Sequence, residues 1–99
     1  MTALVVIGPD DLGDPGWAEA RSIAEITELV RAGRTVAVTP AALAGDDQEA
    51  AELAAASICA WNGARVFRTT RPDQVRLAVE MTESLAGRRP PALTRRGLA

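Results

Sequence analysis

Short apolar runs alternate with longer amphipathic stretches along the chain, and each run ends at a proline or at polar residues. Residues 3–7 read ALVVI, residues 34–39 read RTVAVT and residues 64–68 read ARVFR. Continuous apolar runs bounded by turn residues are typical of strands that are covered on both faces, as in parallel sheets. We therefore predict a strand at each of these three positions.

The stretches that follow the three runs have helical periodicity, and they predict helices over 15–32, 46–61 and 72–86. Their expected packing stripes are Trp17, Ala20, Ile23, Ile26 and Val30; Ala54, Ser57, Ile58 and Trp61; and Val75, Ala78, Val79, Thr82 and Leu85. The two tryptophans are expected to pack in the core or at a subunit interface.

Capping residues mark the ends of these helices. The start signals are Asp14 before Pro15, Asp46 three residues before Glu49, and Thr70 three residues before Asp73. The stop signals are Gly33, Gly63 and Gly87.

Strand and helix alternate three times, which predicts an α/β fold of β-α-β-α-β-α order with a three-stranded parallel sheet and right-handed crossovers. We expect one domain over 1–87 and an Arg/Pro-rich tail over 88–99. A three-stranded parallel sheet seldom stands alone, and its exposed edges invite pairing with another chain. The chain is therefore expected to be a small flavodoxin-like sheet that dimerises or a part of a larger barrel, and to self-associate.

Composition restricts the chemistry of any active site. The 99 residues include no histidine, and all 11 basic residues are arginines. Histidine and lysine supply most general bases near neutral pH, so catalysis would rest on carboxylates, hydroxyls, arginines and the single cysteine. Cys59 lies in an alanine-rich helix and is expected to be a small buried hydrophobe.

The sequence shows neither a signal-peptide pattern nor an apolar run long enough for a membrane span, so we expect a cytoplasmic protein with no membrane contact. No basic region precedes a long apolar stretch, and no apolar run approaches the roughly 20 residues of a membrane span. The tail carries four arginines and no acid on an otherwise acidic chain. Without interleaved aromatic residues this is a weak signal for nucleic acid, which we do not expect as a partner, and the tail can equally fold back on the acidic body.

Three segments carry a resemblance to a known family. Residues 60–72 read AWNGARVFRTTRP, residues 36–45 read VAVTPAALAG, and residues 8–14 (GPDDLGD) fit a glycine-rich loop more loosely. With Ala78-Val79 in the following helix, residues 3–86 resemble the last three βα units of the dihydropteroate synthase, or pterin-binding, (β/α)₈ family. The resemblance implies a fold like the C-terminal part of a TIM barrel.

Most functional residues of that family have no counterpart in this chain. The family's pterin-binding aspartate falls on Gly8, its lysine on Ala41 and its histidine on Thr70, whereas its arginine is retained as Arg68. In the family, that arginine and histidine contact the anionic leaving group and the pterin face. The first five βα units also have no counterpart, so we expect neither synthase activity from this chain alone nor a cofactor.

A polar cluster follows the last predicted strand and consists of Arg68, Thr69, Thr70 and Arg71. Ligands of α/β folds bind at the carboxyl ends of strands, and hydroxyl and N–H groups beside arginines form anion sites. Together with Thr39, at the end of the preceding predicted strand, the cluster is the candidate site for a phosphate-containing or pterin-like anion. The alternative is structural: Thr70 caps the helix while the arginines pair with Asp73 and nearby acids.

Asp10 and Asp11 follow the first predicted strand and are weak candidates for a Mg²⁺ site, since they offer oxygen ligands. Phosphoryl-transfer receivers also carry such an acidic pair, but they need a lysine and a further aspartate at the end of a central strand. Turn formation and capping account for these aspartates better, and no metal is expected.

Three functions are open. The first is a non-catalytic, truncated relative of the synthase barrel that acts as a homodimer or by binding a larger barrel-type protein. The second is a small-molecule binder with an anionic or pterin-like ligand at the strand ends. The third, an enzyme based on carboxylates, ranks last because no base–nucleophile pair is visible.

Overall fold

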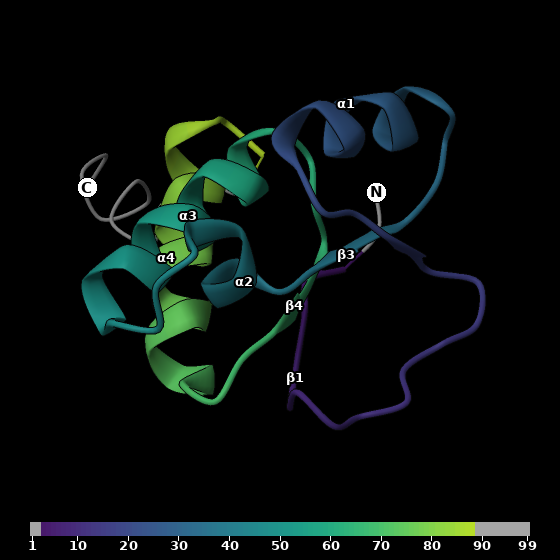
Figure 1. Cartoon of the computed structure of the whole chain (residues 1–99). Helices are drawn as coiled ribbons and strands as arrows, with labels where there is room; N and C mark the ends of the chain where they lie inside the picture. Colours follow the sequence, from purple (N-terminus) through teal and green to yellow (C-terminus); the bar gives the residue numbers. More distant parts are fainter. Residues whose placement is uncertain (1–2, 89–99) are drawn as a thin grey trace.

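The structure, a computed structural model that describes residues 3–88, is a four-stranded all-parallel sheet with four helices (Figure 1). The strands are β1 (Val5–Ile7), β2 (Ala18–Glu19), β3 (Val36–Val38) and β4 (Val66–Arg68). The helices are α1 (Ile23–Arg31), α2 (Pro40–Ala44), α3 (Glu49–Trp61) and α4 (Pro72–Leu85). The predicted α/β class with a parallel sheet is confirmed, but the predicted number of three strands is wrong. Apart from Arg88, the predicted tail lies outside the described residues.

The strand that the sequence pattern missed is β2. The Ala18 N–H donates to the Thr35 carbonyl at 2.8 Å, and the Ala20 N–H donates to the Ala37 carbonyl at 2.9 Å, so this segment pairs in parallel with β3. Two residues are too few to show an alternating pattern. The predicted helix over 15–32 is therefore wrong in its first half, because backbone groups far along the chain draw this segment into the sheet.

α1 begins at Ile23 because Ser22, rather than Asp14, is its N-cap. The Ser22 hydroxyl accepts the Glu25 N–H at 3.1 Å, which satisfies one of the free N–H groups of the first turn. The Asp14 carboxylate accepts the Gly16 N–H at 2.7 Å instead and forms a local turn ahead of β2.

The loop predicted between the second strand and the second helix contains the short helix α2. Pro40 suits its first turn, where no N–H is needed, and Gly45 ends it at a φ of 68°. α3 then begins at Glu49 rather than at Asp46, because the Asp46 carboxylate accepts the Gln48 N–H at 2.8 Å and forms a turn before the helix.

α4 begins at Pro72 as predicted, but Thr70 does not cap it. The Thr69 hydroxyl accepts the Arg71 N–H at 2.9 Å, and no side chain caps the first turn. With 14 residues, α4 is the longest helix in the described range. Nowhere in residues 3–88 does a helix have the length and apolar character needed to cross a membrane.

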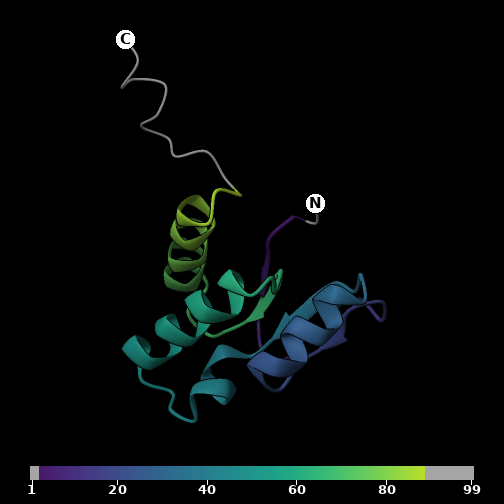
Figure 2. The ribbon, with the colours of Figure 1, turned by 90° about the horizontal axis from the view of Figure 1, so that it is seen from above.

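The three longer helices pack against one face of the sheet. Val38 and Phe67 are register partners in β3 and β4, and both belong to a buried core with Ile26 of α1, Cys59 of α3 and Val79 of α4. Because register partners point to the same face, the three helices share that face. Figure 2 shows the helices following one another around one side of the strands, and Figure 1 shows the segment between β1 and β2 as a wide loop on the side away from α3 and α4.

The sheet order β1-β4-β3-β2 places the first strand beside the last one. β2, β3 and β4 lie side by side in chain order, as the strands of consecutive barrel units do. Three consecutive units would place residues 3–7 beside residues 34–39, but Val5 pairs with Val66 of β4. The first strand therefore does not lie where the barrel resemblance implies.

α3 turns a different face to the sheet from the one predicted. Its buried residues are Glu52, Ala56, Cys59 and Ala60. Ile58 and Trp61, which were expected to be packed, are more than half exposed. An alanine-rich helix has no single apolar stripe, and its small side chains permit the closest approach to the strands, so the large ones lie outside. In α4, Val75 and Val79 are buried as predicted, whereas Leu85 is exposed.

Candidate functional site at the strand carboxyl ends

Arg68, which the resemblance matches to an arginine of the pterin-binding family, lies on the sheet face opposite the helices, since it follows Phe67 in β4. Its guanidinium forms an ion pair with Glu19 of β2 at 3.0 Å and donates to the Asp11 carbonyl. Gly13 is packed against the same side chain, because an added Cβ would lie 3.0 Å from its Nη2 atom. Arg68 thus joins β4, β2 and the loop after β1.

Thr69 and Arg71 point to the other side and form a closed cluster with Glu52 of α3. The buried Thr69 hydroxyl donates to the Glu52 carboxylate at 2.6 Å, and the Arg71 guanidinium lies 2.6 Å from the same carboxylate. Arg71 also donates to the Asp47 carbonyl at 2.8 Å. This cluster ties the start of α4 to the start of α3.

The structure therefore divides the predicted anion site. Both arginines are compensated by carboxylates, Arg68 by Glu19 and Arg71 by Glu52, so an anion at either guanidinium would have to compete with a carboxylate that is already in place. The structural alternative expected Asp73 and nearby acids as partners, and the carboxylates that pair with the arginines are those of Glu19 and Glu52. Thr70 is exposed and lies outside the cluster.

Thr39 lies in a pocket of about 420 Å³ at the carboxyl ends of β2 and β3. The pocket is lined by Glu19, Ala20, Arg21, Thr39, Ala42 and Leu43. It therefore combines a carboxylate, a guanidinium and a hydroxyl on an otherwise apolar wall. Of the predicted site residues only Thr39 lines this pocket, and Arg68 reaches it through its ion pair with Glu19.

Asp10 and Asp11, the weak candidates for a metal site, lie in the turns of the loop after β1. The Asp11 carboxylate accepts the Gly13 N–H at 2.9 Å, and both Asp10 and Asp11 are exposed in the loop after β1. Within residues 3–88 no three histidine, cysteine or acidic side chains gather in a group that would hold a metal ion.

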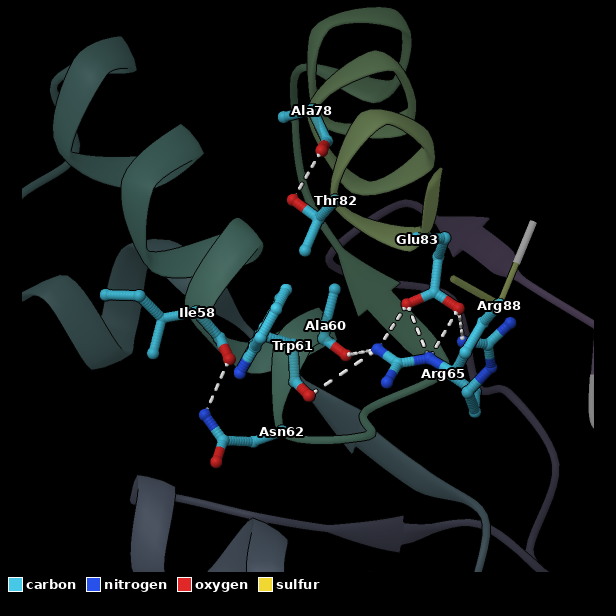
Figure 3. A network of polar contacts seen from close by, with 9 residues as sticks. All are labelled: Ile58, Ala60, Trp61, Asn62, Arg65, Ala78, Thr82, Glu83 and Arg88. Atoms are coloured by element: carbon cyan, nitrogen blue, oxygen red, sulfur yellow. Dashed lines mark hydrogen bonds and ion pairs between the residues drawn. The ribbon is translucent and has the colours of Figure 1, made fainter. Parts of the chain in front are cut away.

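Sequence reasoning missed a buried carboxylate, Glu83 of α4. Figure 3 shows the guanidinium groups of Arg65 and Arg88 converging on it. The ion pairs of Glu83 with Arg65 and with Arg88 measure 2.5 Å and 2.6 Å. Arg88 also donates to the Ala60 carbonyl at 2.6 Å, near the end of α3. The network therefore joins the start of β4, the end of α3 and the chain just beyond α4.

Burial opposes ionisation of Glu83, but hydrogen bonds from Arg88 and Arg65 outweigh it and hold the pKa of Glu83 below its ordinary value of 4.5. The bond to Glu83 in turn raises the pKa of Arg88. Both groups are thus charged at neutral pH, as expected of a structural ion-pair network.

Helix periodicity contains the signal that would have identified Glu83. It lies four residues after Val79 and eight after Val75, on the buried stripe of α4. Glu52 is likewise four residues before Ala56 on the buried side of α3. A glutamate on such a stripe needs a basic partner, and arginines near strand ends are the available ones.

Cys59 is fully buried in the core as predicted, and burial raises the pKa of its thiol to about 11. The thiol is therefore protonated at neutral pH and unsuited to act as a nucleophile.

No protein-family model, curated protein or solved structure matches this chain. The resemblance to the pterin-binding family thus rests on sequence motifs alone, and the family arginine retained as Arg68 is engaged by Glu19 and by the loop after β1. What the site does has to be argued from the geometry of the described residues.

Proposed function

We propose that this chain is a non-catalytic interaction module, a truncated relative of the pterin-binding barrels, which acts by associating with a second copy of itself or with a larger barrel-type protein. The observation that carries the proposal is that α3 and α4 expose large apolar side chains. These side chains are Ile58, Trp61, Leu77, Met81 and Leu85. Clusters of exposed apolar side chains mark interaction sites on soluble proteins.

The sheet edges support the same function. β1 and β2 each pair with a single neighbour within the described part of the chain. Uncovered edges of parallel sheets are templates for pairing with another chain. With three residues in β1 and two in β2, however, the edges offer few hydrogen bonds, so the helix surfaces contribute most of the apolar area.

The state of the reactive groups supports a function without catalysis. A nucleophile needs an adjacent base, and histidine and lysine, which supply most bases near neutral pH, do not occur in the chain. The single thiol is buried and protonated, and both arginines of the strand-end cluster are paired with carboxylates.

Sedimentation velocity from low micromolar to near-millimolar concentration tests self-association. We expect a mass above the 10.4 kDa of one chain that rises with concentration. A mass that stays at one chain throughout would contradict self-association. The proposal would then rest on a partner protein, to be tested by retention of a barrel-type protein on the immobilised chain and its loss with Met81→Glu.

A specific observation also favours small-molecule binding, namely the strand-end pocket with Glu19, Arg21 and Thr39 on its wall. We propose as second candidate that it takes a small ligand with both a hydrogen-bond donor edge and an anionic group, such as a pterin diphosphate. Calorimetry with pterin diphosphate and inorganic phosphate is the test. Binding that is unchanged in both Arg21→Ala and Arg68→Ala would exclude this pocket.

A further inference from the structure

The strand-end pocket contains a guanidinium group that no carboxylate compensates within residues 3–88. Arg21 lines this pocket, and its side chain forms no ion pair or hydrogen bond in the described part of the chain. The carboxylate of Glu25 accepts the backbone N–H of Arg21 at 2.6 Å, but it neither lines the pocket nor pairs with the guanidinium. Arg21 is therefore available to an anion, whereas Arg68 and Arg71 are already paired.

Two further polar groups of the pocket wall have free hydrogen-bonding capacity. The Thr39 hydroxyl forms no capping bond with α2. The Glu19 carboxylate accepts both bonds from Arg68 through one oxygen, Oε2, at 3.3 Å and 3.0 Å. Its other oxygen, Oε1, accepts no hydrogen bond from the residues that the structure describes, and the Glu19 side chain is 51% exposed. The wall thus presents two donors, Arg21 and Thr39, and one acceptor, Glu19.

The charge at the wall favours a ligand with one negative charge. Glu19 and Arg68 compensate each other, which leaves the positive charge of Arg21. A monocarboxylate neutralises that charge. A diphosphate brings more than one negative charge and leaves an excess beside Glu19, whereas an amino acid brings its own ammonium group and leaves the charge of Arg21 in excess. The matching ligand has one carboxylate and an uncharged donor.

The rest of the wall is apolar and suits a short aliphatic chain. It consists of Ala20, Ala42 and Leu43, and the pocket has a volume of about 420 Å³. Small-molecule sites are typically concave and mostly apolar, with a few polar groups that fix the orientation of the ligand. The apolar wall therefore contributes to affinity, and the three polar groups select the ligand.

We propose that the strand-end pocket binds a small α-hydroxy acid with an aliphatic side chain, an inference that rests on the second candidate function. The carboxylate of the ligand accepts hydrogen bonds from Arg21 and Thr39. Its hydroxyl donates to the Oε1 atom of Glu19, which Arg68 holds in position through Oε2. The aliphatic chain lies against the apolar wall.

Three acids with the same carbon skeleton test the ligand class. α-Hydroxyisocaproate carries both required groups, isocaproate lacks the hydroxyl, and leucine has an ammonium group in its place. Isothermal titration calorimetry with the full chain is expected to show saturable binding of α-hydroxyisocaproate. Its affinity should exceed that of the other two acids about 10-fold, as expected for one hydrogen bond to a charged group.

Two variants assign the groups of the ligand to the pocket wall. Arg21→Gln removes the uncompensated charge and is expected to weaken binding of α-hydroxyisocaproate at least about 10-fold. Glu19→Ala removes the acceptor for the hydroxyl, so that α-hydroxyisocaproate and isocaproate bind alike. Arg34→Gln is the matched control and leaves binding unchanged, because Arg34 is also exposed but does not line the pocket. Circular dichroism checks that each variant is folded.

The outcomes separate the inference from the function on which it rests. Tighter binding of α-hydroxyisocaproate that depends on both Arg21 and Glu19 supports the inference. Isocaproate or leucine that binds as tightly, or an Arg21→Gln variant that binds like the wild type, overturns it. If inorganic phosphate or pterin diphosphate binds and α-hydroxyisocaproate does not, the inference fails and the second candidate function stands. If none of these compounds binds, both fail.

Discussion

The carboxylate of Glu83 is the group whose neutralisation we expect to destabilise the fold most. It is 2% exposed and lies 2.5 Å from Arg65 and 2.6 Å from Arg88. Glu83→Gln preserves the size of the side chain and removes its charge. Two guanidinium groups then face a neutral amide, whose NH₂ group adds further donors where acceptors are needed.

The structure sets the expected magnitude. Removing one partner of a buried ion pair costs about 3–5 kcal/mol, because the other charge remains buried without compensation. The Arg65 side chain is 12% exposed and regains little hydration, whereas Arg88, at 29%, regains more. We therefore expect about 3 kcal/mol, at the lower end of that range. For a domain of this size the loss corresponds to a fall in Tm of roughly 12–24 °C.

Urea unfolding followed by circular dichroism, with thermal scans as a second measure, tests this expectation. Glu80→Gln is the control, since it makes the same charge change on the same helix at a position without an ion pair among the described residues. The reasoning is refuted if the two variants differ by less than about 0.5 kcal/mol, the usual size of a surface effect.

Three further predictions concern pH, the thiol and the loop after β1. The pKa of Glu83 is lowered in the folded state, so its carboxylate stabilises the fold fully above pH 4.5, and this stabilisation is lost as the pH falls below that value. The difference in unfolding free energy between wild type and Glu83→Gln should therefore narrow in acid. A difference that stays constant in urea titrations from neutral to acidic pH contradicts this. Cys59, with a pKa of about 11, should react with thiol reagents only as fast as the protein unfolds, and rapid labelling of the native state would show that it is accessible. Gly13→Ala should lose about 1–3 kcal/mol and alter Trp17 fluorescence, because Gly13 has a φ of 69° and its new Cβ would lie 2.8 Å from the Trp17 ring; unchanged stability and emission would argue against close packing there.

The elements defined by local signals were predictable from sequence. The apolar run of β1, the start of α4 at Pro72 and the stop of α1 before Gly33 all depend on neighbouring residues, and the structure has them where predicted. β2 was not predictable in this way. Its two residues form a strand only because the N–H groups of Ala18 and Ala20 donate to the carbonyls of Thr35 and Ala37, contacts that no local period encodes.

The candidate site divides along the same line. The position of Arg68 and Thr69 at the end of a strand follows from the apolar run before them. Which acids compensate the arginines does not follow, because Glu19 and Glu52 come from a strand and a helix that only the tertiary fold brings near. The buried face of α3 could not be predicted either, because alanines lie on every side of this helix and its hydrophobic pattern favours no single face. Tertiary packing selects the face that is buried.

The bonds of Arg88 show that the folded unit extends beyond the end of α4. Its guanidinium forms an ion pair with Glu83 of α4 and donates to the Ala60 carbonyl near the end of α3 at 2.6 Å, so this one side chain after α4 links α4 to α3. A chain cut after Leu85 would keep every strand and helix of the described residues yet lose these bonds of Arg88. A boundary for expression or fusion therefore has to include Arg88, which a diagram of the helices and strands alone would leave out.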